Sequence, residues 1–299
     1  MKLYILIICL LLTGKALEAQ TLSDDDLRRI EQRRVFASGF YRNERGSASY
    51  CAGANELAFI CAAENKKDSA FYFLNETFSY KGSDVKVLNS IYDPFNLGSY
   101  PFIKWTKSPE WKSYEKTISD KYLASRKDLK LARLSLELIR ALGTDQSIRL
   151  YSMKIRHDDK AKADWHKIDS AGLLLIKQAV KKYGFPGRSM VGDDGYEAAF
   201  ILCQHADDDL AFQKTILDQL KKLTVSGDAK KQDQAYLTDR IMVKEKGMQV
   251  YGTQFKSAGL LYPIQDSANV DRHRAEMGLG TLAEYKKGFS GSGTGPGRN

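Results

Sequence analysis

The sequence predicts a mainly α-helical protein, in which a small helical unit precedes a larger helical domain that contains one short extended pair. Apolar residues recur at spacings of three and four along most of the chain, which is the period of amphipathic helices. Glycine, proline and helix-capping residues divide these stretches. A composition of 43% hydrophobic and 28% charged residues excludes a largely disordered chain.

The first 19 residues have the pattern of a secretory signal peptide. Lys2 supplies the positive start, Leu3 to Leu12 are apolar, and a more polar stretch ends at Ala19. The apolar run is about half the roughly 20 residues that a membrane-spanning helix needs. We therefore expect segment 1–19 to be removed, which leaves a periplasmic or secreted protein with no integral membrane segment; an uncleaved tether is the alternative.

The chain carries a formal net charge of +9, and basic residues are densest between Lys104 and Arg133. Four acids and two tryptophans interrupt this stretch, and no nucleic-acid reading motif accompanies it, so we expect no nucleic-acid partner. A solvated helix face or weak attraction to an anionic surface explains the stretch.

Three cysteines follow the predicted signal: Cys51, Cys61 and Cys203. If one helix carries Cys51 and Cys61, they lie about 15 Å apart, beyond the roughly 7 Å limit for a disulfide, so we predict none between them. The chain has no Cys-x-x-Cys pair, and its four histidines do not have the spacing of metal ligands. We therefore predict no bound metal and no cofactor.

Helices are expected throughout the first part of the mature chain. Small apolar residues recur in one helix and aromatic residues in the next, which favours a tightly packed antiparallel pair. The predicted elements are a helix over Leu22–Phe36, two helices between Ser49 and Lys81 separated by the turn Asn65–Asp68, and a helix from Pro109, capped by Ser108, to about Leu123.

The passage from Tyr50 to Ile118 resembles a single tetratricopeptide unit and the segment that often trails it, here Val85–Leu97 before a Pro-x-Trp helix. No second copy follows at the roughly 34-residue period of such repeats. We therefore assign residues 20–125 to a tetratricopeptide-like unit, which implies a possible protein partner at this front unit.

The second half is predicted to be helical, and glycine, proline and capping residues mark the expected helix ends. Gly143 is expected to end one helix and Thr144 to cap the next, while Asp207 is expected to cap a helix that begins at Asp208. The remaining predicted elements are helices Ala163–Tyr183, Tyr196–Gln204 after an Asp194–Glu197 capping box, and Gln234–Lys246, an extended Val250–Phe255 paired near Leu260–Ile264, a helix Val270–Lys287 interrupted by Gly278 and Gly280, and a flexible tail 288–299.

Residues 126–287 resemble an uncharacterised bacterial family, domain of unknown function 6624. One departure is Gly172, where the family pattern has an asparagine. The resemblance implies a helical fold and a set of polar positions, but no reaction. Seven elements carry it, in order: Asp145-Gln146-x-x-Arg149; Trp165-x-x-x-Asp169; Gly184 to Gly187 with Val191 to Gly195; Gln204 to Asp207; Tyr236 to Arg240; Tyr251 to Gln254; and Pro263 to Asp266 with Val270-Asp271-x-x-Arg274.

His205 is the leading candidate for proton transfer, because a histidine at a helix C-terminus beside a second helix start is well placed to change its charge. Asp239 is the second catalytic candidate, because either Asp239 or Asp145 would orient His205. A histidine that only bonds the carbonyls of its own helix is the structural alternative. Arg240, one turn after Tyr236, is expected either to grip a ligand carboxylate or to pair with Asp145 or Asp169.

The predicted ligand-binding residues are Asp145, Gln146, Arg149, Gln204, Arg240 and Gln254. The glycine-rich stretches 184–187 and 191–195 predict turns rather than a phosphate loop, because no Gly-Lys-Ser/Thr follows and Asp193 and Asp194 would repel an anion. Three functions remain open: a module that binds an unknown small molecule or peptide, an acid/base hydrolase using His205, and an interaction scaffold. No obvious nucleophile supports the hydrolase.

Overall fold

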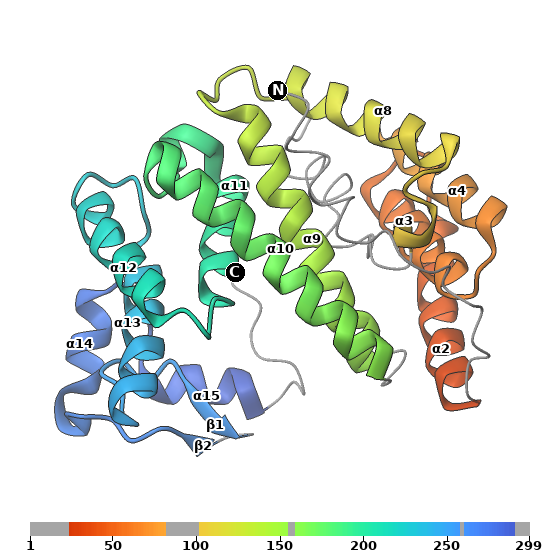
Figure 1. The fold of residues 1–299 in the computed structure, drawn as a ribbon. Helices are drawn as coiled ribbons and strands as arrows, with labels where there is room; N and C mark the ends of the chain where they lie inside the picture. The colour runs from red at the N-terminus through yellow and green to blue at the C-terminus, as the bar shows by residue number, and fades with distance from the viewer. Residues whose placement is uncertain (1–23, 82–101, 155–158, 258–259, 291–299) are drawn as a thin grey trace. The chain divides into compact units, whose positions relative to one another are not determined.

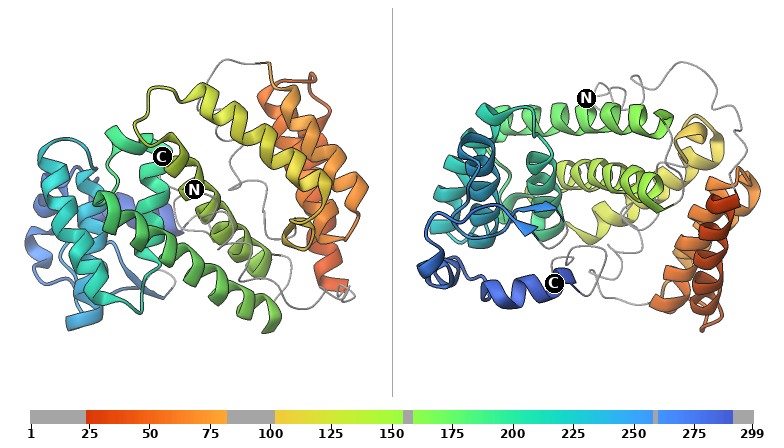
Figure 2. Two further views of the ribbon diagram at one scale, coloured as in Figure 1. Left: turned by 45° about the horizontal axis from the view of Figure 1, so that its top comes forward. Right: turned by 90° about the horizontal axis from the view of Figure 1, so that it is seen from below.

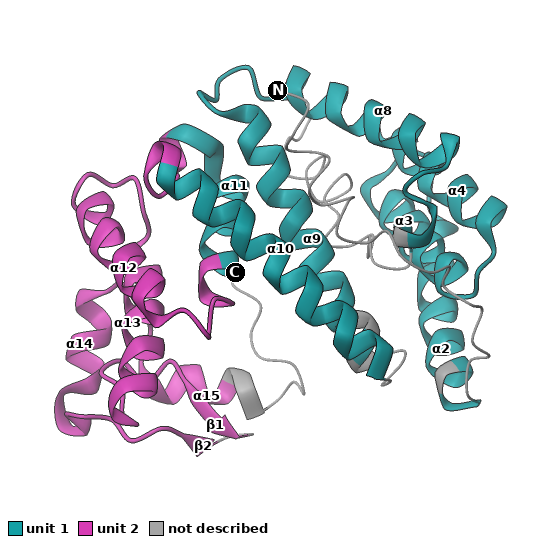
Figure 3. Ribbon diagram, in the orientation of Figure 1, with its two compact units in different colours: residues 1–181, 190–202 teal, residues 182–189, 203–299 magenta. Residues whose placement is uncertain are grey.

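The computed structural model describes residues 24–81, 102–154, 159–257 and 260–290 (Figure 1). The mainly helical fold with one short extended pair is confirmed. The chain forms two compact units (Figure 3): the first combines the described residues up to Lys181 with Met190–Leu202, and the second combines Lys182–Ser189 with the described residues from Cys203 onward. The predicted signal peptide and the stretch Val85–Leu97 lie outside the described residues.

The first unit begins with three helices that lie side by side in chain order (Figure 2), and the predicted pair between Ser49 and Lys81 is confirmed. Gly53 lets the first two approach closely, because a Cβ there would lie 2.5 Å from the backbone nitrogen of Tyr41. Asn65, at a φ of 61°, makes the turn between the second and third. The helices are α2 (Asp24–Tyr41), α3 (Ala48–Ala63) and α4 (Lys67–Glu76), followed by the 3-10 turn η1 (Thr77–Ser79).

A second 3-10 turn, η2 (Ile103–Trp105), leads to α8 (Pro109–Ser125). Ser108 caps α8 as predicted, since its hydroxyl accepts from the backbone nitrogen of Trp111. Aromatic rings, those of Phe71, Phe102 and Trp111 among them, fill the core between α4 and α8. Cys51 and Cys61 are buried and free, so the predicted absence of a disulfide between them is confirmed.

The predicted helix break at Gly143 is wrong, because α9 runs without interruption over Ala132–Lys154. Thr144 lies inside this helix, and its hydroxyl donates to the carbonyl of Arg140 one turn earlier. Leu142 and Ile148, on either side of the glycine, are both buried. Burial along the whole helix therefore outweighs the roughly 1 kcal/mol that an interior glycine costs.

Two further helices complete the first unit. α10 (Asp159–Tyr183) starts earlier than predicted and ends as predicted at Gly184, whose φ is 75°. α11 (Arg188–Gln204) contains a non-helical residue, Gly192, with a φ of 73°, shortly before the predicted restart at Asp194. The start of α11 is held by Asp228, whose carboxylate accepts from the backbone nitrogen of Ser189 at 2.6 Å and from its hydroxyl at 2.9 Å.

The second unit contains the described elements from α12 onward. Asp209, not Asp207, caps α12, because the Asp209 carboxylate accepts from the backbone nitrogen of Phe212. The extended pair is antiparallel and matches Phe255 with Leu261. The predicted tail begins too early, since helix continues to Ser290. The elements are α12 (Leu210–Val225), α13 (Lys231–Lys246), β1 (Phe255–Ser257), β2 (Leu260–Leu261), η3 (Ser267–Asn269), α14 (Val270–Glu276) and α15 (Leu282–Ser290).

Among the helices within the described ranges, none combines the length and the apolar character needed to span a bilayer.

Candidate functional site

Two aspartates and one arginine meet where α9 and α10 lie together in the first unit. Asp145 and Arg149 stand one turn apart on α9, and Nη1 of Arg149 donates to the Asp145 carboxylate. Nη2 of the same guanidinium donates to the Asp169 carboxylate of α10 at 2.9 Å. The guanidinium carbon lies 4.7 Å from the centre of the Trp165 ring. One cation therefore holds two carboxylates over an aromatic face.

The two carboxylates differ in exposure. Asp145 is 1% exposed and also accepts from Nε2 of Gln146 at 2.7 Å, whereas the Asp169 side chain is 27% exposed. Burial raises the pKa of Asp169, and the neighbouring Asp145 carboxylate raises it further, while Arg149 acts in the opposite direction. Asp169 therefore binds a proton more tightly than a free aspartate does.

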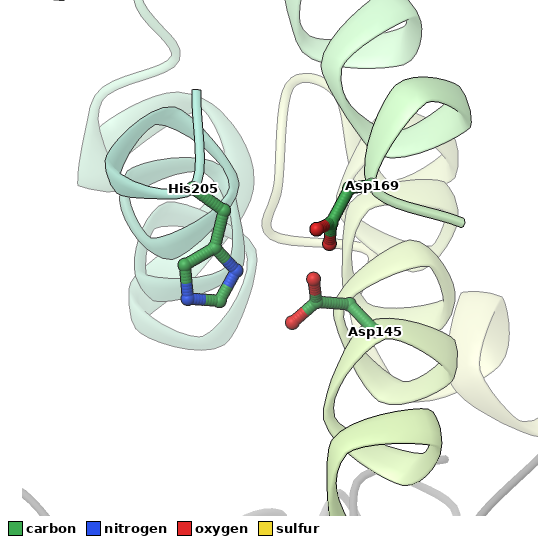
Figure 4. Close-up of side chains that lie close together, drawn as sticks. All are labelled: Asp145, Asp169 and His205. Carbon is green, nitrogen blue, oxygen red and sulfur yellow. The ribbon is translucent and has the colours of Figure 1, made fainter. Parts of the chain in front are cut away.

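His205 follows directly after the last turn of α11. Residues 190–202 of this helix pack in the same unit as α10: a Cβ at Gly172 would lie 2.9 Å from the Leu202 side chain. Gly172 thus serves close helix packing and has no polar role. The ligand atoms of Asp145, Asp169 and His205 all lie within 4.8 Å of one another (Figure 4). These residue types suit acid–base chemistry or a divalent cation, although Arg149 already neutralises part of the negative charge.

Asp239 is fully buried and anchors the loop after α13. Its carboxylate accepts from the backbone nitrogens of Val250, Tyr251 and Thr253, and from the hydroxyl of Thr253, at 2.7 to 3.2 Å. Four hydrogen-bond donors hold this carboxylate in place. Asp239 is therefore a structural anchor of the loop.

Arg240 pairs with an aspartate that the sequence did not suggest. Its Nε and Nη2 each donate to the Asp207 carboxylate at 2.7 Å, which forms a two-point fork. Burial opposes the charge on Asp207, but the hydrogen bonds and charge of Arg240 outweigh it and lower the pKa of this carboxyl. The fork of Arg240 is thus occupied within the second unit, and Asp145 and Asp169 are held by Arg149 instead.

Two of the three predicted glutamines, Gln204 and Gln254, make hydrogen bonds that involve the backbone. Nε2 of Gln254 donates to the Thr253 hydroxyl at 3.1 Å, and its backbone nitrogen donates to the buried Gln249. The carbonyl of Gln204 accepts from the buried side chain of Gln213. Of the predicted site residues, Asp145, Gln146 and Arg149 contact one another in the first unit, whereas the contacts of Asp239, Arg240 and Gln254 lie in the second unit.

Asp169 and Trp165 belong to the site but were not selected from the sequence. A usable signal was present: Asp145 and Arg149 are spaced by four residues, and so are Trp165 and Asp169 on the next helix. That spacing places each pair on one helix face, so two such pairs on consecutive helices favour a shared contact.

One protein-family sequence model matches residues 132–292, and its description is a family of unknown function (DUF6624). The match begins at the first residue of α9. No curated protein and no solved structure gives a significant match.

Proposed function

The chain belongs to the family of unknown function that matches residues 132–292, and from this premise we propose that it is an exported helical module of the cell envelope that binds a small ligand or peptide. The signal-like pattern of residues 1–19 supports export. The Asp145–Asp169 pair supports binding, because one of its carboxylates is buried and fixed while the other is reached by solvent.

The chemistry of the pair points to a ligand that donates hydrogen bonds, such as an amine or a peptide N–H group. The carboxylates outnumber the one guanidinium that they share. A cationic ligand group would supply the second positive charge and gain a charge-assisted hydrogen bond. The observation that carries the proposal is the partly exposed Asp169 carboxylate beside a fixed arginine.

The test is a thermal-shift screen of amines, amino acids and short peptides, with calorimetry on each ligand found. Asp169→Asn should weaken binding about tenfold or more, the usual loss of a hydrogen bond to a charged group. Asp159→Asn is the matched control, because it makes the same charge change at a fully exposed position of α10. Equal affinity of wild type and Asp169→Asn would exclude this site.

The second candidate function is acid–base catalysis with His205 as the proton carrier and Asp145 or Asp169 as its partner. The observation that favours it is the closeness of one imidazole to two carboxylates, whose ligand atoms all lie within 4.8 Å of one another. General acid–base catalysis needs a proton donor and a proton acceptor gathered at one place.

For a substrate that the screen identifies, His205→Gln should reduce turnover by about 10²- to 10⁴-fold with an unchanged circular dichroism spectrum. His166→Gln, on the exposed face of α10, is the control and should keep full activity. If His205→Gln weakens affinity and the wild type has no turnover, the chain is a binding module. Wild-type turnover that survives in His205→Gln would rule out the catalytic role.

A further inference from the structure

Three side chains of the metal-binding residue types converge from separate helices. Asp145 lies on α9, Asp169 lies on α10, and His205 follows directly after α11. Each offers one ligand atom, and these atoms all lie within 4.8 Å of one another (Figure 4). His205 continues a helix that packs closely against α10, where a Cβ at Gly172 would lie 2.9 Å from Leu202. Helix packing therefore sets the position of all three side chains.

Neighbouring side chains hold the two carboxylates in place. Arg149 donates to the Oδ1 atom of Asp145 and, at 2.9 Å, to the Oδ1 atom of Asp169. Gln146 donates to the Oδ2 atom of Asp145 at 2.7 Å. A carboxylate has about four lone-pair sites on its two oxygens, so these contacts orient the carboxylates without using all of their capacity. Outer partners of this kind orient the ligands of metal sites.

The charge of the cluster and its exposure both favour a bound cation. When both carboxylates are ionised, their two negative charges face the single positive charge of Arg149. Asp145 is 1% exposed, and a buried charge that is not fully compensated is costly. The Asp169 side chain is 27% exposed and His205 is partly exposed, so an ion reaches the ligand atoms from solvent.

The ligand set matches a transition-metal ion better than Mg²⁺ or Ca²⁺. Mg²⁺ and Ca²⁺ prefer oxygen ligands, whereas an imidazole nitrogen suits Zn²⁺ and similar ions. Zn²⁺ also accepts carboxylate oxygens, at about 2.0 to 2.2 Å. Ligand atoms around one Zn²⁺ ion therefore lie at most about 4.4 Å apart. From separations within 4.8 Å, a shift of less than about 1 Å closes the site.

We propose that Asp145, Asp169 and His205 form a binding site for a divalent transition-metal ion, with Zn²⁺ as the best match. The proposal rests on the carboxylate pair of the proposed ligand site and adds His205 as the third ligand. Three protein ligands leave a further position open, for water or for a donor atom of the ligand. Histidine spacing in the sequence does not reveal this site, because its ligands come from three helices.

The experiment titrates Zn²⁺ or Mg²⁺ into the full chain by calorimetry, after EDTA has removed bound metal and without a histidine tag. One Zn²⁺ ion should bind per chain, and Mg²⁺ should bind at least about tenfold more weakly. Zn²⁺ at about a hundred times its Kd should raise the melting temperature by about 5 °C. A protein that shows no saturable Zn²⁺ binding, or that binds both ions equally, overturns the proposal.

His205→Ala should weaken Zn²⁺ binding by at least about tenfold, since even the loss of an outer partner costs that much in metal sites. His166→Ala, at an exposed position of α10, is the matched control and should bind Zn²⁺ as the wild type does. If His205→Ala does not fold, Asp169→Asn replaces it and should show a similar loss. Equal Zn²⁺ affinity in the wild type and the ligand variant, or an equal loss in His166→Ala, overturns the proposal.

The metal site and the proposed ligand site can fail separately. The amine and peptide screen is repeated in the presence of EDTA, where only the carboxylate pair and its neighbours act. Ligand binding there without any Zn²⁺ binding overturns the metal site and leaves the proposed function in place. Zn²⁺ binding that depends on His205, in a protein that binds no amine or peptide, supports the metal site and excludes the proposed ligand.

Discussion

At the scale of single residues, two aspartates show how neighbours decide the state of a carboxyl group. Asp239 is fully buried, yet four hydrogen-bond donors surround its carboxylate. Asp169 is partly exposed, but it faces a second carboxylate and shares one arginine with it. In the sequence, Asp169 and Asp239 are both isolated aspartates, and neither composition nor spacing distinguishes their roles. Their roles follow from contacts that only the folded chain creates.

The raised pKa of Asp169 predicts how its replacement changes stability with pH. Because the folded state binds this proton more tightly than the unfolded state, its stabilising contribution is complete below the ordinary aspartate pKa of about 3.9 and is lost as pH rises through the raised pKa. Asp169→Asn should therefore melt at or above the wild-type temperature at pH 7, and the difference should vanish near pH 4. Thermal unfolding between these values measures it.

Asp159→Asn should follow the wild type across the same pH range, because Asp159 is fully exposed. If Asp169→Asn melts well below the wild type at pH 7 and matches it at pH 4, the ion pair with Arg149 outweighs the burial and repulsion that raise the Asp169 pKa.

At the scale of elements, helix interiors were easier to predict than helix starts. The periodicity of apolar residues identified most helices, but α11 starts where a residue 39 positions away in the sequence holds it. Gly187 permits this contact, because a Cβ there would lie 2.1 Å from an Asp228 carboxylate oxygen. No local signal in residues 184–195 indicates Asp228. The same limit explains the wrong cap at Asp207, which pairs with Arg240 across the second unit.

Gly187→Ala should destabilise the protein by about 1 kcal/mol, the usual cost of a lost N-terminal cap, because the new methyl group would displace the Asp228 carboxylate from Ser189. Gly39→Ala is the contrasting variant: it lies within α2 and has no atom within 4 Å of an added Cβ. It should leave stability unchanged or increase it. Thermal unfolding of both variants measures the effect. A Gly187→Ala protein as stable as the wild type would show that Asp228 does not hold the start of α11.

At the scale of the whole molecule, the sequence predicted the helical class and the resemblance to the family, because both depend on patterns that are local or repeated along the chain. The boundary predicted near residue 125 falls in the connection between α8 and α9, and it stays a prediction. The compact units divide elsewhere, after Lys181 and after Leu202. Contacts between residues far apart in the sequence define such units. The positions of glycine and proline do not indicate which distant residues make contact.

The path of the chain through its two units limits how either can be separated. The first unit needs residues 190–202, but the chain enters the second unit at residues 182–189 before it returns to supply them. No single cut therefore releases either unit intact, and a fragment ending at residue 181 lacks all of α11. A gene duplication or fusion that transferred only one unit would transfer an incomplete one. We therefore expect the two units to be inherited together. The family match over residues 132–292 includes parts of both units.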